Sequence, residues 1–289
     1  MTDTEEEMAP SFAVIIPVFN GRDHVLDAVA SALDQPHLAQ VVVVDDGSSD
    51  GSADLVRRLG DPRVEVLEQE NAGPGAARNA GAAVATARFL VFLDADDRLL
   101  PGALEVFAAL HASGSEVART GAVSRSAPGA DQILPAMPHP LPFPRGCPLA
   151  GSFSVSKSLF DAIGGYDVEL RFGENTELLM RLHQTAEGRG ADTAFGEVPT
   201  VLRMVLGERS DDRYDISRLK AIERMLSIHE AELREDRETL ASHLAIASRL
   251  ERKAGRWGRS IHHAQRCARA DPRNPRAWGR LLRSLLPVA

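Results

Sequence analysis

Short apolar runs alternate with amphipathic segments through about the first hundred residues of the chain. Four runs are predicted to be strands: FAVIIPV (12–18), VVVVDD (41–46), RVEVLEQ (63–69) and RFLVFLD (88–94). The first two are continuous and β-branched, which is typical of parallel strands buried on both faces. The segments between the strands are predicted to be helices, at 21–36, 53–60 and 73–87. This alternation predicts a doubly wound α/β domain.

The pattern becomes less regular beyond Pro101. Helices are expected at 102–114 and 173–186, strands at 116–124 and 200–206, and a strand, a helix and a Gly-Gly turn at 152–167. The proline-rich segment 126–148 is predicted to be a long surface loop, because proline lacks the N–H that regular elements need. The chain is therefore divided into a disordered tail (1–10), an α/β domain (11–212) and a helical segment (213–289).

The helical segment contains one stretch with a repeat-like pattern. Residues 254–286, AGRWGRSIHHAQRCARADPRNPRAWGRLLRSLL, are similar to a tetratricopeptide unit, with small residues at Ala264 and Ala268. Only one to one and a half units are visible, and an isolated repeat does not bury its apolar face. We therefore expect these helices to dock on the main domain or on another chain.

Charge is unevenly distributed along the chain. The formal net charge is −8, yet residues 249–289 hold 11 Lys and Arg against 2 Asp and Glu. Two interpretations stay open: a solvated basic surface that faces the acidic main body, or a patch that contacts anionic lipid head groups. Nucleic acid is not an expected partner, because the acidic main body repels phosphates.

Cysteine usage and hydropathy bear on the compartment. Cys147 and Cys267 are the only cysteines, which fits a reducing cytosol rather than a disulfide framework. The acidic N-terminus lacks the pattern of a secretory signal, and no apolar run approaches the length of a membrane span. We expect a cytoplasmic protein, and peripheral contact with the inner membrane surface through the basic segment stays open.

Carboxylates follow two of the predicted strands. Asp45 and Asp46 end the second strand, and Asp94, Asp96 and Asp97 follow the fourth. In open α/β sheets, ligands bind beyond the carboxyl ends of the strands. Residues two apart in a strand point the same way, so Asp94 and Asp96 are expected to converge on one ion. Hard oxygen ligands suit Mg²⁺ or Mn²⁺.

The ordered motifs VIIPVFN, VVVVDDGSSDGS, NAGPGAARNAG, FLDADD and GGYDVELRFGENTELLMRL resemble those of family 2 glycosyltransferases, over residues 12 to 205. The resemblance implies a GT-A fold, which is a Rossmann-like, doubly wound mixed sheet, here with an all-helical C-terminal extension. It also implies a metal-dependent hexosyl- or related transferase of the EC 2.4 class. Such an enzyme moves a sugar, with inversion, from a UDP-, GDP- or dTDP-linked donor to an acceptor hydroxyl with Mn²⁺ or Mg²⁺.

The resemblance also assigns residues to roles. It makes Asp94 and Asp96 the metal ligands, and Asp45 the acceptor of a hydrogen bond from the nucleotide base. Arg78 is expected to clamp the base or the phosphates, or to bridge to Asp94 or Asp45, and these roles are compatible. The full set of residues expected to contact the donor is Pro17, Val18, Asn20, Asp45, Asp46, Gly73, Arg78, Asn79, Asp94 and Ala95.

The sequence departs from the family at the catalytic base. The resemblance places an Asp after Glu174, whereas this chain has Asn175, whose amide does not accept a proton at neutral pH. Three accounts stay open: Glu174 is the base, Glu177 one helical turn on is the base, or the chain is a catalytically weak or inactive partner subunit that binds a nucleotide sugar. The acceptor (a glycan, a lipid-linked glycan, a metabolite or a peptide), the donor sugar and the oligomeric state stay open as well.

Overall fold

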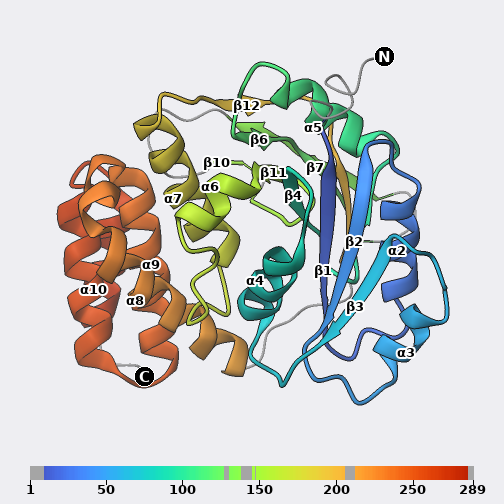
Figure 1. Ribbon diagram of the computed structural model, residues 1–289. Coiled ribbons are helices and arrows are strands. Elements are labelled where there is room, and N and C mark those ends of the chain that lie inside the picture. Colours follow the sequence, from blue (N-terminus) through green and yellow to red (C-terminus); the bar gives the residue numbers. More distant parts are fainter. Residues whose placement is uncertain (1–9, 127–129, 138–144, 147, 206–211, 286–289) are drawn as a thin grey trace. The chain divides into compact units, whose positions relative to one another are not determined.

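The computed structural model describes residues 10–126, 130–137, 145–146, 148–205 and 212–285. These residues form two compact units (Figure 1). The sheet unit comprises the described residues up to 205 except 170–173, and the helical unit comprises 170–173 and 212–285. Residues 1–9 of the N-terminal tail that was expected to be disordered, and Cys147, lie outside the described residues. No helix in the described part is long and apolar enough to cross a membrane.

A seven-stranded mixed sheet organises the sheet unit. In spatial order its strands are β12 (Thr193–Phe195), β6 (Val117–Arg119), β11 (Phe153–Ser156), β4 (Phe89–Phe92), β1 (Phe12–Val18), β2 (Leu38–Asp45) and β3 (Val64–Glu68). The four strands from β4 to β3 are parallel to one another. Strand β11 runs antiparallel to both of its neighbours. The expected doubly wound mixed sheet is therefore confirmed.

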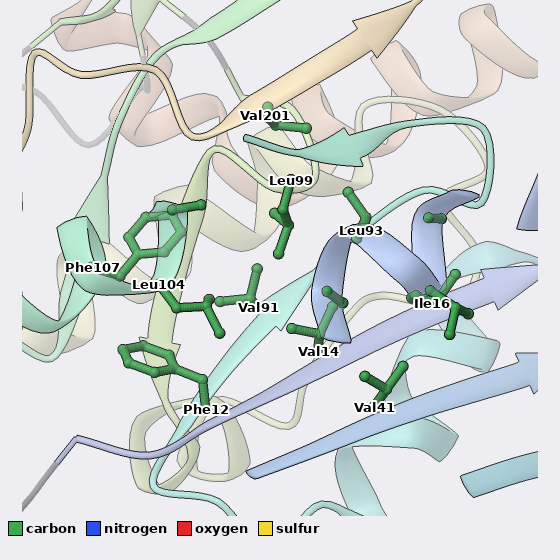
Figure 2. Packing of buried hydrophobic residues seen from close by; sticks show 14 of the residues in the cluster. Phe12, Val14, Ile16, Val41, Val91, Leu93, Leu99, Leu104, Phe107 and Val201 are labelled. Atoms are coloured by element: carbon green, nitrogen blue, oxygen red, sulfur yellow. The ribbon is translucent and has the colours of Figure 1, made fainter. Parts of the chain in front are cut away.

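Helices cover both faces of this sheet, as Figure 1 shows. The bounds are α2 (Val25–Leu33), α3 (Ser52–Arg57) and α5 (Ala103–His111) on one face, and α4 (Pro74–Val84), α6 (Lys157–Ala162) and α7 (Glu174–Gly188) on the other. Successive strand residues point to opposite faces, so Val14 and Ile16 join the core beneath α2 and α5, while Ala13 and Ile15 join the core beneath α4. Figure 2 shows the first of these cores, where Phe12 and Val91 pack near Leu104 and Phe107.

A second sheet of four strands lies in the same unit. Its order is β5 (Arg98–Leu99), β13 (Val201–Met204), β7 (Ala122–Arg125) and β8 (Asp131–Leu134). Strand β13 was expected from the apolar pattern. The single strand expected at 116–124 is instead two strands, β6 and β7, which belong to different sheets. Strands β5 and β12 were not expected, because each is at most three residues long and is held by pairing with a strand distant in sequence.

The prediction of a loop throughout 126–148 is wrong for the described part. Strand β8 pairs antiparallel with β7, and β9 (Ala136–Met137) pairs antiparallel with β10 (Arg145–Gly146). The physical reason is the distribution of the prolines: residues 131–134 contain none, so their N–H groups are free to pair with β7. The remaining residues of the segment, 127–129, 138–144 and 147, lie outside the described part.

The helical unit holds four helices: α8 (Asp212–Glu235), α9 (Arg237–Lys253), α10 (Trp257–Ala270) and α11 (Pro275–Leu285). Helix α8 has a kink at His229, and the Asp236 side chain caps the start of α9 by accepting a hydrogen bond from the Thr239 N–H. One hydrophobic cluster, including Leu226, Leu244, Cys267 and Ala277, draws on all four helices. The two repeat-like helices, α10 and α11, thus pack with α8 and α9, so they do not form an isolated repeat.

Candidate active site

Three carboxylates meet just beyond the end of β4. One carboxylate oxygen from each of Asp94, Asp96 and Asp97 lies within 4.8 Å of the others. Strand β4 occupies the middle of the sheet and is paired with β1 and β11, so the backbone that presents these groups is rigid. Asp94 and Asp96 thus lie close together, and Asp97 joins them, while their expected convergence on one ion stays a prediction.

Asp97 is the most buried member of this group, with 4 % of its surface exposed. Its Oδ1 accepts a hydrogen bond of 2.9 Å from the Met204 N–H at the end of β13. Burial, together with the negative charge of Asp94, raises the pKa of Asp97 to about 8. The three aspartates therefore concentrate more negative charge than the surrounding protein compensates.

Arg78 lies in α4 and is almost completely buried. Its Nη2 is 2.6 Å from Asp94 Oδ1, and its Nη1 is 3.0 Å from Glu174 Oε1. Burial opposes its charge, but the neighbouring Asp94, Tyr166 and Glu174 more than offset this and raise the pKa of Arg78. Of the two bridges considered from the sequence, the structure has the one to Asp94. Arg78 thus connects the aspartate cluster to the first turn of α7.

The first turn of α7 carries Glu174 and Glu177, the two residues considered for the base, and Asn175, which stands where the resemblance places an Asp. Glu174 is paired with Arg78, and its side chain retains 14 % exposure. Asn175 Oδ1 accepts a hydrogen bond of 2.9 Å from the hydroxyl of Tyr166. Burial raises the pKa of Tyr166, so this hydroxyl stays protonated and donates.

Glu177 faces a different environment from Glu174. It is 1 % exposed, and Arg181 Nε and Nη2 each bind one of its carboxylate oxygens at 2.6 Å. A buried carboxylate held by a bidentate guanidinium is a poor base, because taking up a proton would break the pair. The structure therefore argues against Glu177 as the base and leaves Glu174, which is partly exposed, as the more accessible carboxylate of this turn.

The two aspartates at the end of β2 differ in what they bind. Asp46 accepts three hydrogen bonds, of 2.7 Å from Gln69 Nε2 and 2.8 Å each from the Ala72 and Gly73 N–H groups. Both of its oxygens thus hold the loop before α4, and contact of Asp46 with a donor stays a prediction. Among the described residues, Asp45 uses only Oδ1, which accepts a hydrogen bond of 2.6 Å from the Ser48 N–H.

Gly73 ends the loop that Asp46 holds and precedes the first residue of α4. Its φ of 96° lies in a region that residues with a side chain rarely adopt. The positive φ explains why a glycine suits this position, and the expected close approach of a donor to Gly73 stays a prediction.

The end of β1 braces the loop after β2. Asn20, at a φ of 50°, donates its N–H to Ser48 Oγ, and its Oδ1 accepts from the Ser49 N–H, both at 2.9 Å. The Val18 carbonyl accepts from the Asp46 N–H. Pro17 pairs with Val44 within the sheet, and Ala95 packs against the hydrophobic core. The side chain of Asn20 thus shapes the loop rather than pointing away from it.

Asn79 has a structural task that the sequence did not reveal. Its Oδ1 accepts from the Tyr166 N–H at 2.8 Å, and its Nδ2 donates to the Tyr166 carbonyl at 2.9 Å. Gly165 makes this possible, because a Cβ there would lie 2.5 Å from Asn79 Oδ1. The amide thus holds the turn that contains Tyr166, and its expected contact with a donor stays a prediction.

Sequence reasoning missed Tyr166 and Gln69 as parts of the site. The ring of Tyr166 lies 5.2 Å from the guanidinium carbon of Arg78, and its hydroxyl orients Asn175. The only available signal was its place in GGYD, directly before the helix that carries Glu174. Gln69 had no signal, since its contact with Asp46 depends on the pairing of β2 with β3.

Comparison with known proteins comes to the same region of the chain. A family model described as Glycosyl transferase family 2 matches residues 13–164, which is more than half of the chain. The succinoglycan biosynthesis protein ExoU of Rhizobium meliloti is 46% identical over 94 residues, which are 32% of this chain and 28% of ExoU. ExoO of the same organism is 36% identical over 115 residues, which are 39% of this chain and 33% of ExoO. The matches thus span a third or less of these relatives.

Solved structures extend the likeness in fold to nearly the whole chain. The structure of S. aureus TarS 1-349 in complex with UDP superposes with a TM-score of 0.64 at 18% sequence identity. The match covers 95% of this chain and 88% of that one. A complex of TarS 1-349 with UDP-GlcNAc matches with a TM-score of 0.62, also at 18% identity. At this level of identity the likeness concerns the fold.

Proposed function

Because the chain belongs to glycosyl transferase family 2, we propose that it transfers a sugar from a nucleotide-diphosphate donor to an acceptor hydroxyl, with inversion and with a divalent metal. The observation that carries this proposal is the group of three carboxylates beyond β4, backed by the buried Arg78. The group sits at the carboxyl end of a parallel strand, where open α/β sheets bind their ligands.

The residues of this group fit a hard divalent cation. Asp94 and Asp96 would hold Mn²⁺ or Mg²⁺, which prefer carboxylate oxygen. The raised pKa of Asp97 indicates a local excess of negative charge, which a cation would relieve. When bound, the ion would neutralise charge on the leaving diphosphate.

We assign the base to Glu174. Its Oε1 is fixed by Arg78, which leaves Oε2 to accept the proton of the acceptor hydroxyl. The acceptor oxygen forms a bond to the anomeric carbon as the bond from that carbon to the diphosphate oxygen breaks. Arg78 orients Glu174, and Tyr166 orients the neighbouring Asn175, so much of the rate would come from positioning.

A pair of conservative variants tests this assignment. Glu174→Gln is expected to abolish turnover while donor binding, measured by isothermal titration, stays intact. Asn175→Asp is expected to leave turnover within a few-fold, because the Tyr166 hydroxyl still finds an acceptor oxygen. Full turnover by Glu174→Gln would remove Glu174 as the base.

The Asn175 substitution also supports a second candidate function. The chain could be a partner subunit that binds a nucleotide sugar and transfers it slowly or not at all. In that case Asn175→Asp would raise transfer or donor hydrolysis by orders of magnitude over the unaltered chain. Measuring slow donor hydrolysis in both proteins, with Mn²⁺ present, decides between the two functions.

We propose a uridine nucleotide as the leading candidate for the donor, since TarS structures were determined with UDP and UDP-GlcNAc. A ligand that binds only the folded state raises its thermal midpoint. A screen of UDP-, GDP- and dTDP-linked sugars, with and without Mn²⁺, should show the largest shift for one UDP-sugar and only with metal. A larger shift with a GDP- or dTDP-sugar would show that the donor carries guanine or thymine instead of uracil.

The acceptor is proposed to be a growing glycan, because ExoU and ExoO are named for succinoglycan biosynthesis. The basic residues of 249–289 are consistent with an acceptor held at a membrane surface. Co-sedimentation with vesicles containing anionic lipid tests this: binding should fall steeply as salt is raised, and no binding at low salt would refute it.

A further inference from the structure

A second group of potential metal ligands lies in the helical unit. Glu223 of α8, Glu251 of α9 and His263 of α10 each place one ligand atom within 4.8 Å of the other two (helices in Figure 1). The three residues come from three different helices, so the group is made by the packing of the bundle and not by one local turn. Nothing in the proposed transfer reaction uses it.

Two atoms of this group are buried without a hydrogen bond among the described residues. Glu251 is completely buried and its Oε1 has no hydrogen-bond partner. His263 is 7 % exposed and its Nδ1 has none either. Buried polar atoms are almost always paired, because leaving one unpaired costs free energy. An acceptor oxygen and an imidazole nitrogen unpaired in one cluster point to a ligand that both would bind.

The polar layer next to this group is satisfied within the bundle. Ser248 of α9 and Ser260 of α10 face each other, and each hydroxyl donates to the carbonyl of the other residue, at 2.9 and 2.8 Å. Glu251 and His263 each follow the corresponding serine by three residues, about one helical turn further along. The serine layer is therefore satisfied, whereas the Glu251–His263 layer next to it is not.

Two arginines border the group without closing it. Arg256 Nε binds Oε2 of Glu251 and leaves Oε1 unused by that contact. Arg259 Nη1 lies 3.6 Å from both Glu223 Oε1 and Glu251 Oε1, beyond hydrogen-bond distance, and its side chain is 65% exposed. An exposed side chain held at this distance is easily displaced towards solvent by a competing cation.

We propose that Glu223, Glu251 and His263 form a binding site for one divalent transition-metal ion of the zinc class. Two carboxylates and one imidazole are a ligand set that such ions accept, with a position left for water. Because the ligands belong to α8, α9 and α10, the bound ion would join these three helices.

The test uses the full chain with Asp94→Asn and Asp96→Asn, so that the carboxylates beyond β4 do not compete for metal. This background protein, stripped with chelator and dialysed against ZnCl₂, should retain one zinc per chain by elemental analysis. Co²⁺ in place of zinc should give a visible absorption band, and zinc should raise the thermal midpoint. Absence of stoichiometric zinc in this folded protein overturns the proposal.

Three single variants in the same background identify the ligands. His263→Gln and Glu223→Gln should each weaken zinc binding by about 100-fold or more, since even supporting groups contribute 10–100-fold. His262→Gln is the matched control, because His262 is exposed and adjacent, and it should bind zinc as the background does. Circular dichroism checks that each variant is folded, and Glu223→Gln, at a partly exposed position, keeps the test valid if His263→Gln unfolds. Unchanged binding in both ligand variants, or equal loss in the control, overturns the proposal.

Discussion

The two carboxylate clusters of this molecule solve the problem of buried charge in different ways. Beyond β4, the buried Arg78 contacts both Asp94 and Glu174, and the remaining aspartates retain an excess of negative charge. In the helical unit, one oxygen of Glu251 is paired with Arg256, while its other oxygen and Nδ1 of His263 have no hydrogen-bond partner among the described residues. The first cluster is backed by a cation that the fold supplies, whereas the second is bordered by an exposed arginine that is easily displaced.

This difference teaches what each cluster is suited to. A cluster with a fixed internal cation is preorganised, so that its outer carboxylates meet an ion and a ligand without rearrangement. A cluster that lacks one gains stability whenever a cation arrives. We therefore expect changes in the first cluster to alter turnover, and changes in the second to alter only the metal-dependent part of stability.

The largest difference in stability is expected between variants of Arg78, in the first cluster, and Arg259, beside the second. Arg78→Met leaves Asp94 and Glu174 without their buried partner, and breaking such a pair costs about 3–5 kcal/mol of unfolding free energy. Arg259→Met, at a largely exposed side chain, is expected to change it by less than about 0.5 kcal/mol. Urea denaturation of both variants measures the difference. Similar losses in the two would mean that the clusters do not differ in this respect.

The next largest effect concerns turnover. Asp94→Asn and Asp96→Asn should each reduce kcat by about 10²–10³-fold, the range seen when one group that stabilises developing charge is removed. In metal-free buffer, the unfolding free energy of each variant should fall by less than the activation free energy rises, because each variant also relieves repulsion within the cluster. Raising the Mn²⁺ concentration should partly restore the turnover of whichever variant binds the metal more weakly. Normal kcat in both would separate the aspartates from the reaction.

A pH dependence sharpens the description of the first cluster. The folded pKa of Asp97 is raised to about 8 from an ordinary value of 3.8, so between these values the folded state holds a proton that the unfolded state lacks. Stability is therefore lost as pH rises, by up to about 1.4 kcal/mol per pH unit. Asp97→Asn retains an acceptor for the Met204 N–H and should remove this slope in metal-free buffer. Parallel pH profiles of the two proteins from pH 5 to 7 would contradict the expectation.

The smallest effect is expected at Glu223. Without added metal, Glu223→Gln should shift unfolding free energy by less than about 0.5 kcal/mol, since its ion pair with Arg259 is long and partly exposed. Turnover should be unchanged within error in a steady-state assay. A marked loss of turnover would show that the two clusters are not independent.

The sequence predicted the centre of the fold better than its margins. Strands such as β1 and β2 are continuous apolar runs, because helices cover both of their faces, and such runs are visible in one sequence. Strand β8 is only four residues long, has little apolar character and lies next to prolines. Its existence depends on pairing with β7, which no local pattern reports.

The same distinction applies to the site. The aspartates beyond β4 were predictable because they are close in sequence and end an apolar run. The contact between Arg78 and Glu174 joins residues 96 positions apart and follows only from the fold. In α9 a signal was present: Leu240, Leu244 and Ala247 recur at helical spacing on the buried side, and Glu251 continues that series as a charged residue.

The bond between Asn79 and Tyr166 has a consequence for how this site can evolve. One amide satisfies both backbone groups of Tyr166, and Gly165 leaves the space in which that amide lies. We expect single changes at either position to be harmful. A side chain at 165 would displace the Asn79 amide, and a residue at 79 without an amide would leave the N–H and the carbonyl of Tyr166 without these hydrogen bonds. Substitutions at positions 79 and 165 are therefore expected to occur together. Arg78 is the neighbour of Asn79 in the chain. A change at Asn79 would therefore shift both the arginine that contacts Asp94 and the turn that precedes Glu174.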